Sequence, residues 1–262
     1  MTRVRRPAVA GLFYPGNSKE LKRVIETFLD NTQTTPGNPP KALIVPHAGY
    51  IYSGAVAASA YVLLKPLAST IKRVILLGPS HRVPLRGLAL PEADVFASPL
   101  GEVALETETM TALHKFPQIT TNDAAHAAEH SLEVHLPFLQ TLLSDFSLIP
   151  LVVGETTPEQ VAEVLEVLWG GEETLIVVST DLSHYNDYQT AQRMDAETSE
   201  AIKALRYNDL AHDQACGRNP VRGLLYAAGK HNMTLDILDL RNSGDTAGAR
   251  DQVVGYGAYV LH

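Results

Sequence analysis

The sequence predicts a single α/β domain over residues 1–262, with a mostly parallel, mixed central sheet flanked by helices. Continuous apolar runs rich in Ile, Val and Leu alternate along the chain with segments of helical spacing, as expected for a sheet covered on both faces. The 262 residues, 45% of them hydrophobic, are enough for one large core. No internal repeat or low-complexity tract divides the chain, so one domain is the simplest organisation.

The individual elements follow from these patterns. Four strong strand signals are the apolar runs at 42–46, 73–78, 147–154 and 174–180, and weaker ones lie at 85–91, 234–242 and 255–261. Helical spacing predicts helices over 18–30, 53–65, 106–116, 131–143, 157–169, 188–206 and 220–231. Ser18 and Thr157 are the expected N-caps, and Pro158 suits the first helical position after Thr157. The stretch 31–41 is expected to join the first helix to the first core strand.

Composition excludes several classes of function. The formal net charge is −8 and no basic stripe is visible, so no nucleic-acid partner is expected. Apolar runs are far shorter than the ~20 residues of a membrane span, so no membrane partner is expected either. The N-terminal segment carries three arginines and lacks the apolar core of a signal peptide. One cysteine cannot form an internal disulfide, which favours a reducing, cytoplasmic location.

Polar residues follow three of the four strong strand signals. These residues are His47, His81, and the pair Asp181 and His184. In open α/β sheets ligands bind at the carboxyl ends of the strands, and parallel strands present those ends along one edge. We therefore expect the four side chains to share one cleft although they are far apart in sequence.

The segment "AAEHSLEVH" adds further candidates. If the helix predicted here includes His130, then His130 and Glu133 share a face, whereas His135 lies about 140° round the helix and cannot easily serve the same site. The alternative is a helix N-terminus with solvated acids. His130 and Glu133 therefore stand as candidates beside a structural interpretation, while His126 and His135 are expected to be structural.

The lone Cys216 has two interpretations. Beside Arg218 and a helix N-terminus, its thiol pKa would fall, which suits metal ligation or redox chemistry. The alternative, favoured by the residues alone, is a small buried side chain, the commoner fate of a single cysteine.

Two imidazoles with a carboxylate or thiolate can hold a divalent metal and leave coordination positions open. A carboxylate suits iron(II), whereas a thiolate favours softer metals such as zinc or copper. An imidazole such as His184, with Asp181 nearby, could transfer protons. The Ser80–His81 pair suggests a hydrolase only weakly, because the chain has no G-x-S-x-G motif; it also lacks a P-loop and a G-x-G-x-x-G motif.

Six motifs carry a resemblance to a known family: "RRPAVAGLFYP", "VPHAGYIYSG", "LLGPSH", "EHSLEVHLPFLQ", "STDLSHY" and "CGRNPV". From about residue 5 to 260 they occur in the order found in the Memo family, named in bacteria AmmeMemoRadiSam system protein B. The resemblance implies a fold similar to the class III extradiol (LigB-like) dioxygenases, which bind non-haem iron at strand ends.

The resemblance also implies roles for single residues. The family's metal ligands, two histidines and a cysteine, match His47, His81 and Cys216, which reverses the interpretation of Cys216 as merely buried. Asp181 and His184 match the pair lining the same pocket. His130 and Glu133 match the "EHSxE" element of the family and are kept as catalytic candidates. A cysteine in place of the dioxygenases' glutamate ligand means that ring cleavage cannot be inherited from the fold.

Two functions are therefore expected to compete. The first is a metal-binding, redox-type protein that holds iron or copper in a dioxygenase-like pocket. Zinc is possible in purified protein, and the pocket is expected to take a small molecule. Whether the protein is an oxidoreductase is left open by the sequence. The second is a non-enzymatic module of the AmmeMemoRadiSam system, whose vestigial pocket binds a peptide or a partner such as a radical-SAM protein. A hydrolase using Ser80 or a metal-bound water is a weaker third.

Overall fold

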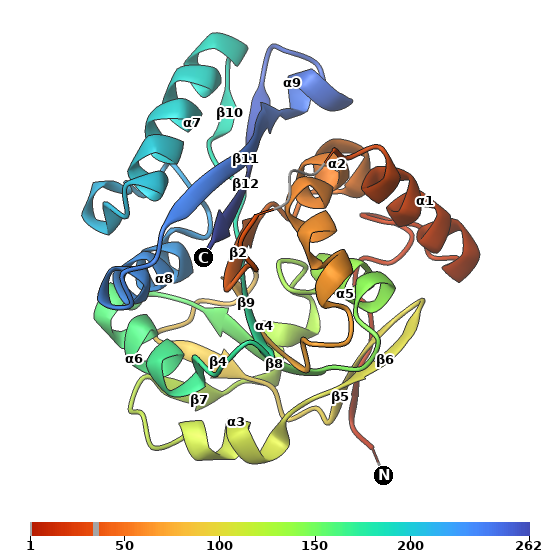
Figure 1. Cartoon of the computed structure of the whole chain (residues 1–262), viewed down its shortest axis with the longest axis vertical. Helices are drawn as coiled ribbons and strands as arrows, with labels where there is room; N and C mark the ends of the chain where they lie inside the picture. Colours follow the sequence, from red (N-terminus) through yellow and green to blue (C-terminus); the bar gives the residue numbers. More distant parts are fainter. Residues whose placement is uncertain (1, 34–36) are drawn as a thin grey trace.

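A computed structural model describes residues 2–33 and 37–262 of the chain. Its centre is a nine-stranded mixed sheet that runs through the molecule (Figure 1). The order across the sheet is β10 (His184–Asn186), β12 (Val253–Leu261), β2 (Ala42–Val45), β9 (Thr174–Ser179), β3 (Arg73–Pro79), β8 (Ser147–Val153), β4 (Leu88–Leu90) and β7 (Ile119–Thr121), and β11 (Leu235–Asn242) pairs with β12.

The middle of the sheet is parallel and its edges are mixed, as predicted. Strands β2, β9, β3 and β8 run parallel to one another, whereas β12 is antiparallel to β2 and β4 is antiparallel to β8. The four parallel strands are the four strong apolar runs of the sequence, and their residues are almost all buried. Because parallel strands share direction, their carboxyl ends meet along one edge of the sheet.

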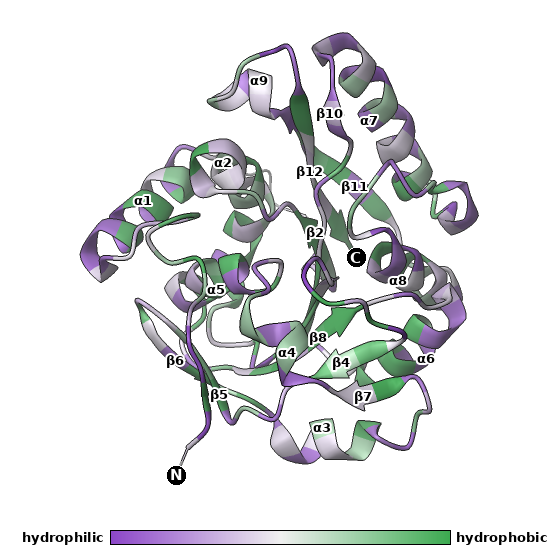
Figure 2. Cartoon of the chain, turned by 180° about the vertical axis from the view of Figure 1, so that it is seen from behind, coloured by the Kyte–Doolittle hydropathy of each residue, from purple (hydrophilic) through white to green (hydrophobic). Residues whose placement is uncertain are grey.

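Helices cover both faces of this sheet. On one side α1 (Ser18–Asp30) and α5 (Leu136–Leu142) pack against α2 (Tyr50–Tyr61), which contacts β2 and β12. On the other side α6 (Pro158–Leu168) packs on α8 (Arg218–Lys230), α8 contacts β3 and β9, and α7 (Tyr188–Lys203) covers β11 and β12 (Figure 1). Figure 2 shows hydrophobic residues concentrated in the central strands and polar residues along much of α1 and α7. The predicted single α/β architecture, consistent with a LigB-like fold, is confirmed.

Smaller elements complete the chain. A second sheet has the order β1 (Val4–Arg5), β5 (Val95–Ser98) and β6 (Gly101–Ala104). The short helices are α3 (Thr107–Leu113), α4 (Asp123–Ala127) and α9 (Ser243–Thr246), with 3₁₀ turns at Val62–Leu67, Glu133–His135 and Tyr207–Asp209. None of the helices among the described residues is both long and apolar enough to cross a membrane.

Several predicted boundaries were wrong for identifiable reasons. Helix α1 is capped by Asn17 rather than Ser18, because the Asn17 side chain accepts the free N–H groups of the first turn. The helix predicted from residue 131 begins at Leu136, since Pro137 suits the first turn of a helix. Thr157 is confirmed as an N-cap in a capping box. Three residues of the predicted connection 31–41, namely 34–36, lie outside the described residues.

Candidate metal centre

His47 lies directly beyond β2 at the carboxyl edge of the sheet. Its backbone N–H donates to Asp181 Oδ1 over 2.8 Å, and the side chain is almost fully buried. The ring Nδ1 contacts Ser179 Oγ at 2.6 Å, while Nε2 faces the sulfur of Cys216 at 3.3 Å. The strand end thus fixes the backbone of His47, and two different neighbours occupy its two ring nitrogens.

His81 follows β3, which β9 separates from β2, and approaches the same point. Its ring centroid lies 5.1 Å from that of His47. Glu129 holds His81 by two bonds, since Oε2 accepts the backbone N–H at 2.6 Å and Oε1 contacts Nδ1 at 2.8 Å. Nδ1 is therefore occupied, which leaves Nε2 as the nitrogen available to a ligand. Carboxylates that hold the second nitrogen of a metal-binding histidine are a recurrent feature of metal sites.

Glu129 belongs to the cluster, although the sequence offered little reason to single it out. Besides His81, its Oε1 accepts the backbone N–H groups of His130 and Ser131, each at 3.0 Å. Burial alone would raise the pKa of this carboxyl, but the hydrogen bonds, with His81 foremost, lower it to about 2. Its position one residue before His130 was the only hint of this role in the sequence, and a glutamate in such a place is usually exposed to solvent.

Cys216 sits just before α8, on the far side of the cluster from His81. Its sulfur lies 3.3 Å from the backbone nitrogen of Asp181 as well as from His47 Nε2. Burial, followed by the nearby Asp181 carboxyl, raises the pKa of the thiol far above its usual value. The interpretation in which Arg218 and the helix N-terminus lower this pKa is therefore not supported, because burial and Asp181 act in the opposite direction.

Asp181 and His184 lie close to the two histidines. Burial raises the pKa of Asp181 to about 7, against the lowering effect of the His47 N–H. His184 Nδ1 lies 2.8 Å from the carbonyl oxygen of Leu182, so Nδ1 carries its proton, and burial lowers the pKa of the ring. Burial, followed by the charge of His81, lowers the pKa of His47, and His184 makes a smaller contribution of the same sign. The four residues expected at strand ends thus gather at one edge of the sheet.

His130 and Glu133 separate in the structure. The His130 ring stacks on His81 with centroids 4.7 Å apart, and its buried Nδ1 lies 3.4 Å from Glu129 Oε1 without hydrogen-bond geometry. The Glu133 carboxylate points elsewhere: it pairs with Arg5 and accepts from Tyr14 Oη at 2.6 Å. Burial and the bond to Glu133 raise the pKa of Tyr14 well above its usual range. The structure therefore brings His130, but not Glu133, to the cluster.

The alternative of a helix N-terminus with solvated acids is wrong, since Glu129 and Glu133 are both 1% exposed or less. The stretch around His130 is not helical, so the argument that kept His135 away from His130 fails. His135 lies behind the cluster, its Nε2 2.9 Å from Ser179 Oγ, while His126 is buried against the carbonyl of Ala89.

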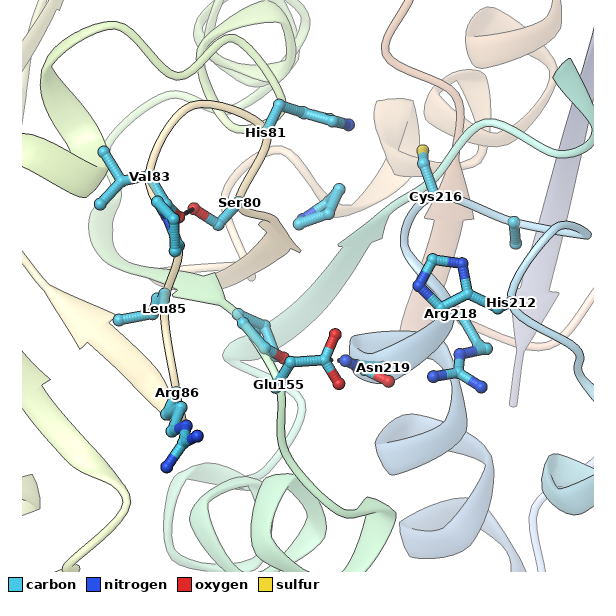
Figure 3. A pocket seen from close by; sticks show the side chains of 15 residues that line it. Ser80, His81, Val83, Leu85, Arg86, Glu155, His212, Cys216, Arg218 and Asn219 are labelled. Carbon is cyan, nitrogen blue, oxygen red and sulfur yellow. Dashed lines mark hydrogen bonds between the residues drawn. The ribbon is translucent and has the colours of Figure 1, made fainter.

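A cavity of about 720 Å³ opens beside the cluster (Figure 3). His81 and Cys216 are on its wall, and the ring of His81 extends towards the side of the cavity where the Cys216 sulfur lies. Further along, the wall is formed by Glu155, His212 and Asn219. His47 and Asp181 do not belong to this lining, whereas His81 and the partly buried Cys216 do.

The donor set fits a metal ion. The ligand atoms of His47, His81 and Cys216 lie within 4.8 Å of one another, so one ion could contact all three. His81, Glu129 and His130 form a second such group, but Glu129 already accepts four hydrogen bonds and has little capacity left for a metal. Two imidazoles and one sulfur, with a cavity beside them, would give a metal ion three protein ligands and leave further coordination positions open.

Comparison with known proteins shows the family of the chain. The chain matches the family described as Memo-like protein over residues 5–260. It is 35% identical over 265 residues to a MEMO1 family protein of Aquifex aeolicus, with 97% of each chain covered. A MEMO1 family protein of Archaeoglobus fulgidus is 34% identical over 274 residues, covering 98% of this chain and 99% of that protein.

A solved structure extends the likeness to the fold. An uncharacterized protein of Escherichia coli K12 aligns with a TM-score of 0.50 at 15% identity, covering 82% of this chain and 98% of the other, a likeness of fold alone. The family match spans nearly the whole chain and includes all the residues of the cluster. The chain therefore belongs to the Memo-like protein family.

Proposed function

We propose that the protein binds a redox-active metal ion, iron or copper, through His47, His81 and Cys216, and presents it to a small molecule in the adjoining cavity. The observation that carries the proposal is the convergence of three ligand atoms within 4.8 Å from three separate elements. Glu129 behind His81 and Ser179 behind His47 hold the two rings, as supporting residues do in metal sites. Zinc would also be accepted by this donor set and could be found in purified protein.

When bound, such an ion would supply redox chemistry and polarise a bound oxygen atom. The other tasks belong to the chain. Cys216 would have to lose its proton to ligate, because the thiolate is the metal-binding form. His184, whose Nδ1 proton is directed to the Leu182 carbonyl, has Nε2 left as a proton acceptor near the cluster. Asp181 holds the His47 backbone in place.

Metal analysis tests the proposal. Protein purified without oxygen and reconstituted with iron(II) or copper should hold about one ion per chain, and His47→Ala, His81→Ala and Cys216→Ser should each remove it. His114→Ala serves as the control, because that exposed histidine only contacts its own surface segment. A stoichiometry near zero in the reconstituted wild-type protein would overturn the proposal. A colour screen with catechols under the same conditions asks whether the pocket cleaves aromatic rings.

The alternative is a binding module that uses the pocket for a peptide or a partner, such as a radical-SAM protein. It is supported by large apolar side chains that are exposed near site residues in sequence. These are Ile51 (69% exposed), four residues after His47, and Tyr185 (70%), next to His184. A pull-down in which partner binding survives alanine substitution of His47 and His81 would favour this function; loss of binding would count against it.

A further inference from the structure

Behind the cluster, away from the cavity, four polar side chains form a continuous buried network. Ser179, at the end of β9, lies at its centre: its Oγ is 2.6 Å from His47 Nδ1, 2.9 Å from His135 Nε2 and 2.6 Å from the carbonyl oxygen of Ser131. His135 Nδ1 is in turn 3.0 Å from Tyr61 Oη. All four side chains are 2% exposed or less, so water cannot replace any partner.

The position of each hydrogen in this network follows from elementary chemistry. A carbonyl oxygen has no proton, so the close contact between Ser179 and Ser131 requires the single hydroxyl hydrogen of Ser179. The Ser179 oxygen can then only accept. Both imidazole nitrogens that face it must therefore carry a proton, Nδ1 in His47 and Nε2 in His135.

The rest of the network is consistent with this assignment. With its proton on Nε2, neutral His135 has a free electron pair on Nδ1, which accepts the hydroxyl hydrogen of Tyr61. His47, with its proton on Nδ1, has its free pair on Nε2, the nitrogen that faces Cys216. Every donor finds an acceptor with both rings neutral. Burial lowers the pKa of both rings, which agrees with neutral imidazoles.

We propose that Ser179, supported by His135 and Tyr61, is the positioning group that sets the tautomer of His47 and so directs the free electron pair of Nε2 to the metal position. The metal part of this inference rests on the proposed function; the tautomer part does not. Because a histidine can ligate only through a deprotonated nitrogen, the opposite tautomer would face the site with an N–H.

The first experiment needs no metal. Long-range ¹H–¹⁵N correlation spectra of the metal-free, ¹⁵N-histidine-labelled protein distinguish the two neutral tautomers. His47 is expected with its proton on Nδ1 and His135 with its proton on Nε2. A wild-type His47 protonated on Nε2 would overturn the proposal. This result does not depend on metal binding, so it separates failure of the tautomer assignment from failure of the proposed function.

The second experiment removes the central hydroxyl. In Ser179→Ala, the His47 Nδ1 proton loses its acceptor, so the ring should shift towards the Nε2-protonated form. The affinity for iron(II), measured by titration, should then fall about 10- to 100-fold. Ser199→Ala is the matched control, since it removes an equally buried hydroxyl that bonds to Tyr259. Wild-type tautomer and wild-type affinity in Ser179→Ala would overturn the proposal.

A second pair of variants decides the matter should Ser179→Ala fail to fold. Tyr61 and Tyr50 are both buried tyrosines of α2, but the Tyr50 hydroxyl donates to the carbonyl of Val134, outside the network. Tyr61→Phe should leave the free electron pair of His135 Nδ1 without its donor, and should therefore change the His135 signals and weaken iron(II) binding severalfold. Tyr50→Phe should leave both the spectra of His135 and the affinity unchanged. Indistinguishable spectra and affinities in the two variants would contradict the network.

Discussion

Glu129 and Glu133 lie four residues apart, are both buried and both accept several hydrogen bonds, yet they serve different parts of the molecule. Glu129 holds the ring and the backbone of His81. Glu133 accepts from the backbone N–H groups of Ala8 and Val9 as well as from Tyr14, and it pairs with Arg5. Glu133 therefore attaches the N-terminal segment to the domain, whereas Glu129 orients a candidate ligand.

Substituting each acid by its amide separates the two roles. Glu129→Gln exchanges a carboxylate that accepts four N–H donors for a group with one acceptor oxygen, so iron(II) affinity should fall about 10- to 100-fold. Glu133→Gln leaves the buried Arg5 without its charge partner, so the free energy of unfolding should fall by about 3 kcal/mol. Iron(II) titration and urea unfolding measure the two effects. Equal loss of metal affinity in both variants would contradict the distinction.

At this scale the sequence located the strand-end residues of the cluster better than the polar residues packed behind them. His47, His81, Asp181 and His184 were found because each follows a strand whose end is recognisable. Glu129 and Ser179 lack such a signal, because a glutamate before a predicted helix and a serine within a predicted strand are common in any protein. Their importance comes from partners that are 48 to 132 positions away in the chain.

The elements follow the sequence most closely where hydrophobic runs are long. The predicted strand 73–78 is β3 and the predicted strand 174–180 is β9, because Ile, Val and Leu in both faces of a covered sheet give an unbroken signal. The predicted strand 85–91 shrinks to Leu88–Leu90, as Gly87 adopts a positive φ of 79°. Strands as short as those of the sheet β1-β5-β6 were missed because two to four residues carry too little periodicity.

The packing of α6 on α8 gives a prediction at the scale of elements. A Cβ added at Gly223 of α8 would lie 2.3 Å from the Cβ of Val161 on α6, whose branched side chain is fully buried. Gly223→Ala should therefore push the helices apart and lower the free energy of unfolding by about 1–3 kcal/mol. Gly229→Ala is the control on the same helix, because nothing lies within 4 Å of its added Cβ.

Urea unfolding should give opposite signs for these two glycine variants. Gly229→Ala is expected to raise the free energy of unfolding by about 0.5 kcal/mol, through the better helix propensity of alanine. A neutral or stabilising Gly223→Ala would show that α6 and α8 can separate without loss, and the close approach of the two helices would then have no energetic importance.

For the whole molecule, stability should fall in mild acid because of His126. This ring is buried, its Nε2 contacts the Ala89 carbonyl at 2.9 Å and its Nδ1 has no partner. Burial lowers its pKa to about 4, against the raising effect of the Ala89 carbonyl. Between about pH 6.5 and 4, His126 is therefore protonated in the unfolded chain, where a histidine has a pKa near 6.5, but neutral in the folded protein.

The sign follows from this difference in bound protons. Stability contributed by neutral His126 is fully present above pH 6.5 and declines as the pH falls, by about 3 kcal/mol at most. The free energy of unfolding, measured at several pH values, should thus decline more steeply in the wild type than in His126→Gln, which keeps a side-chain donor but does not titrate. Parallel pH profiles of the two proteins would show that His126 is protonated equally in both states.

The candidate ligands join distant parts of the chain, so metal binding should stabilise the whole fold. His47 and His81 follow strands of the N-terminal half, whereas Cys216 precedes α8, and the three positions meet only in the folded protein. An ion that binds this state alone, present at 100 times its dissociation constant, raises the free energy of unfolding by about 2.7 kcal/mol. A chelator should therefore lower the midpoint of urea unfolding in wild-type protein and in His114→Ala, but should leave Cys216→Ser unchanged. Equal chelator effects in all three proteins would mean that the ion binds at another site. If the chelator has no effect on wild-type protein loaded with iron(II), the ion binds the folded and the unfolded chain equally well.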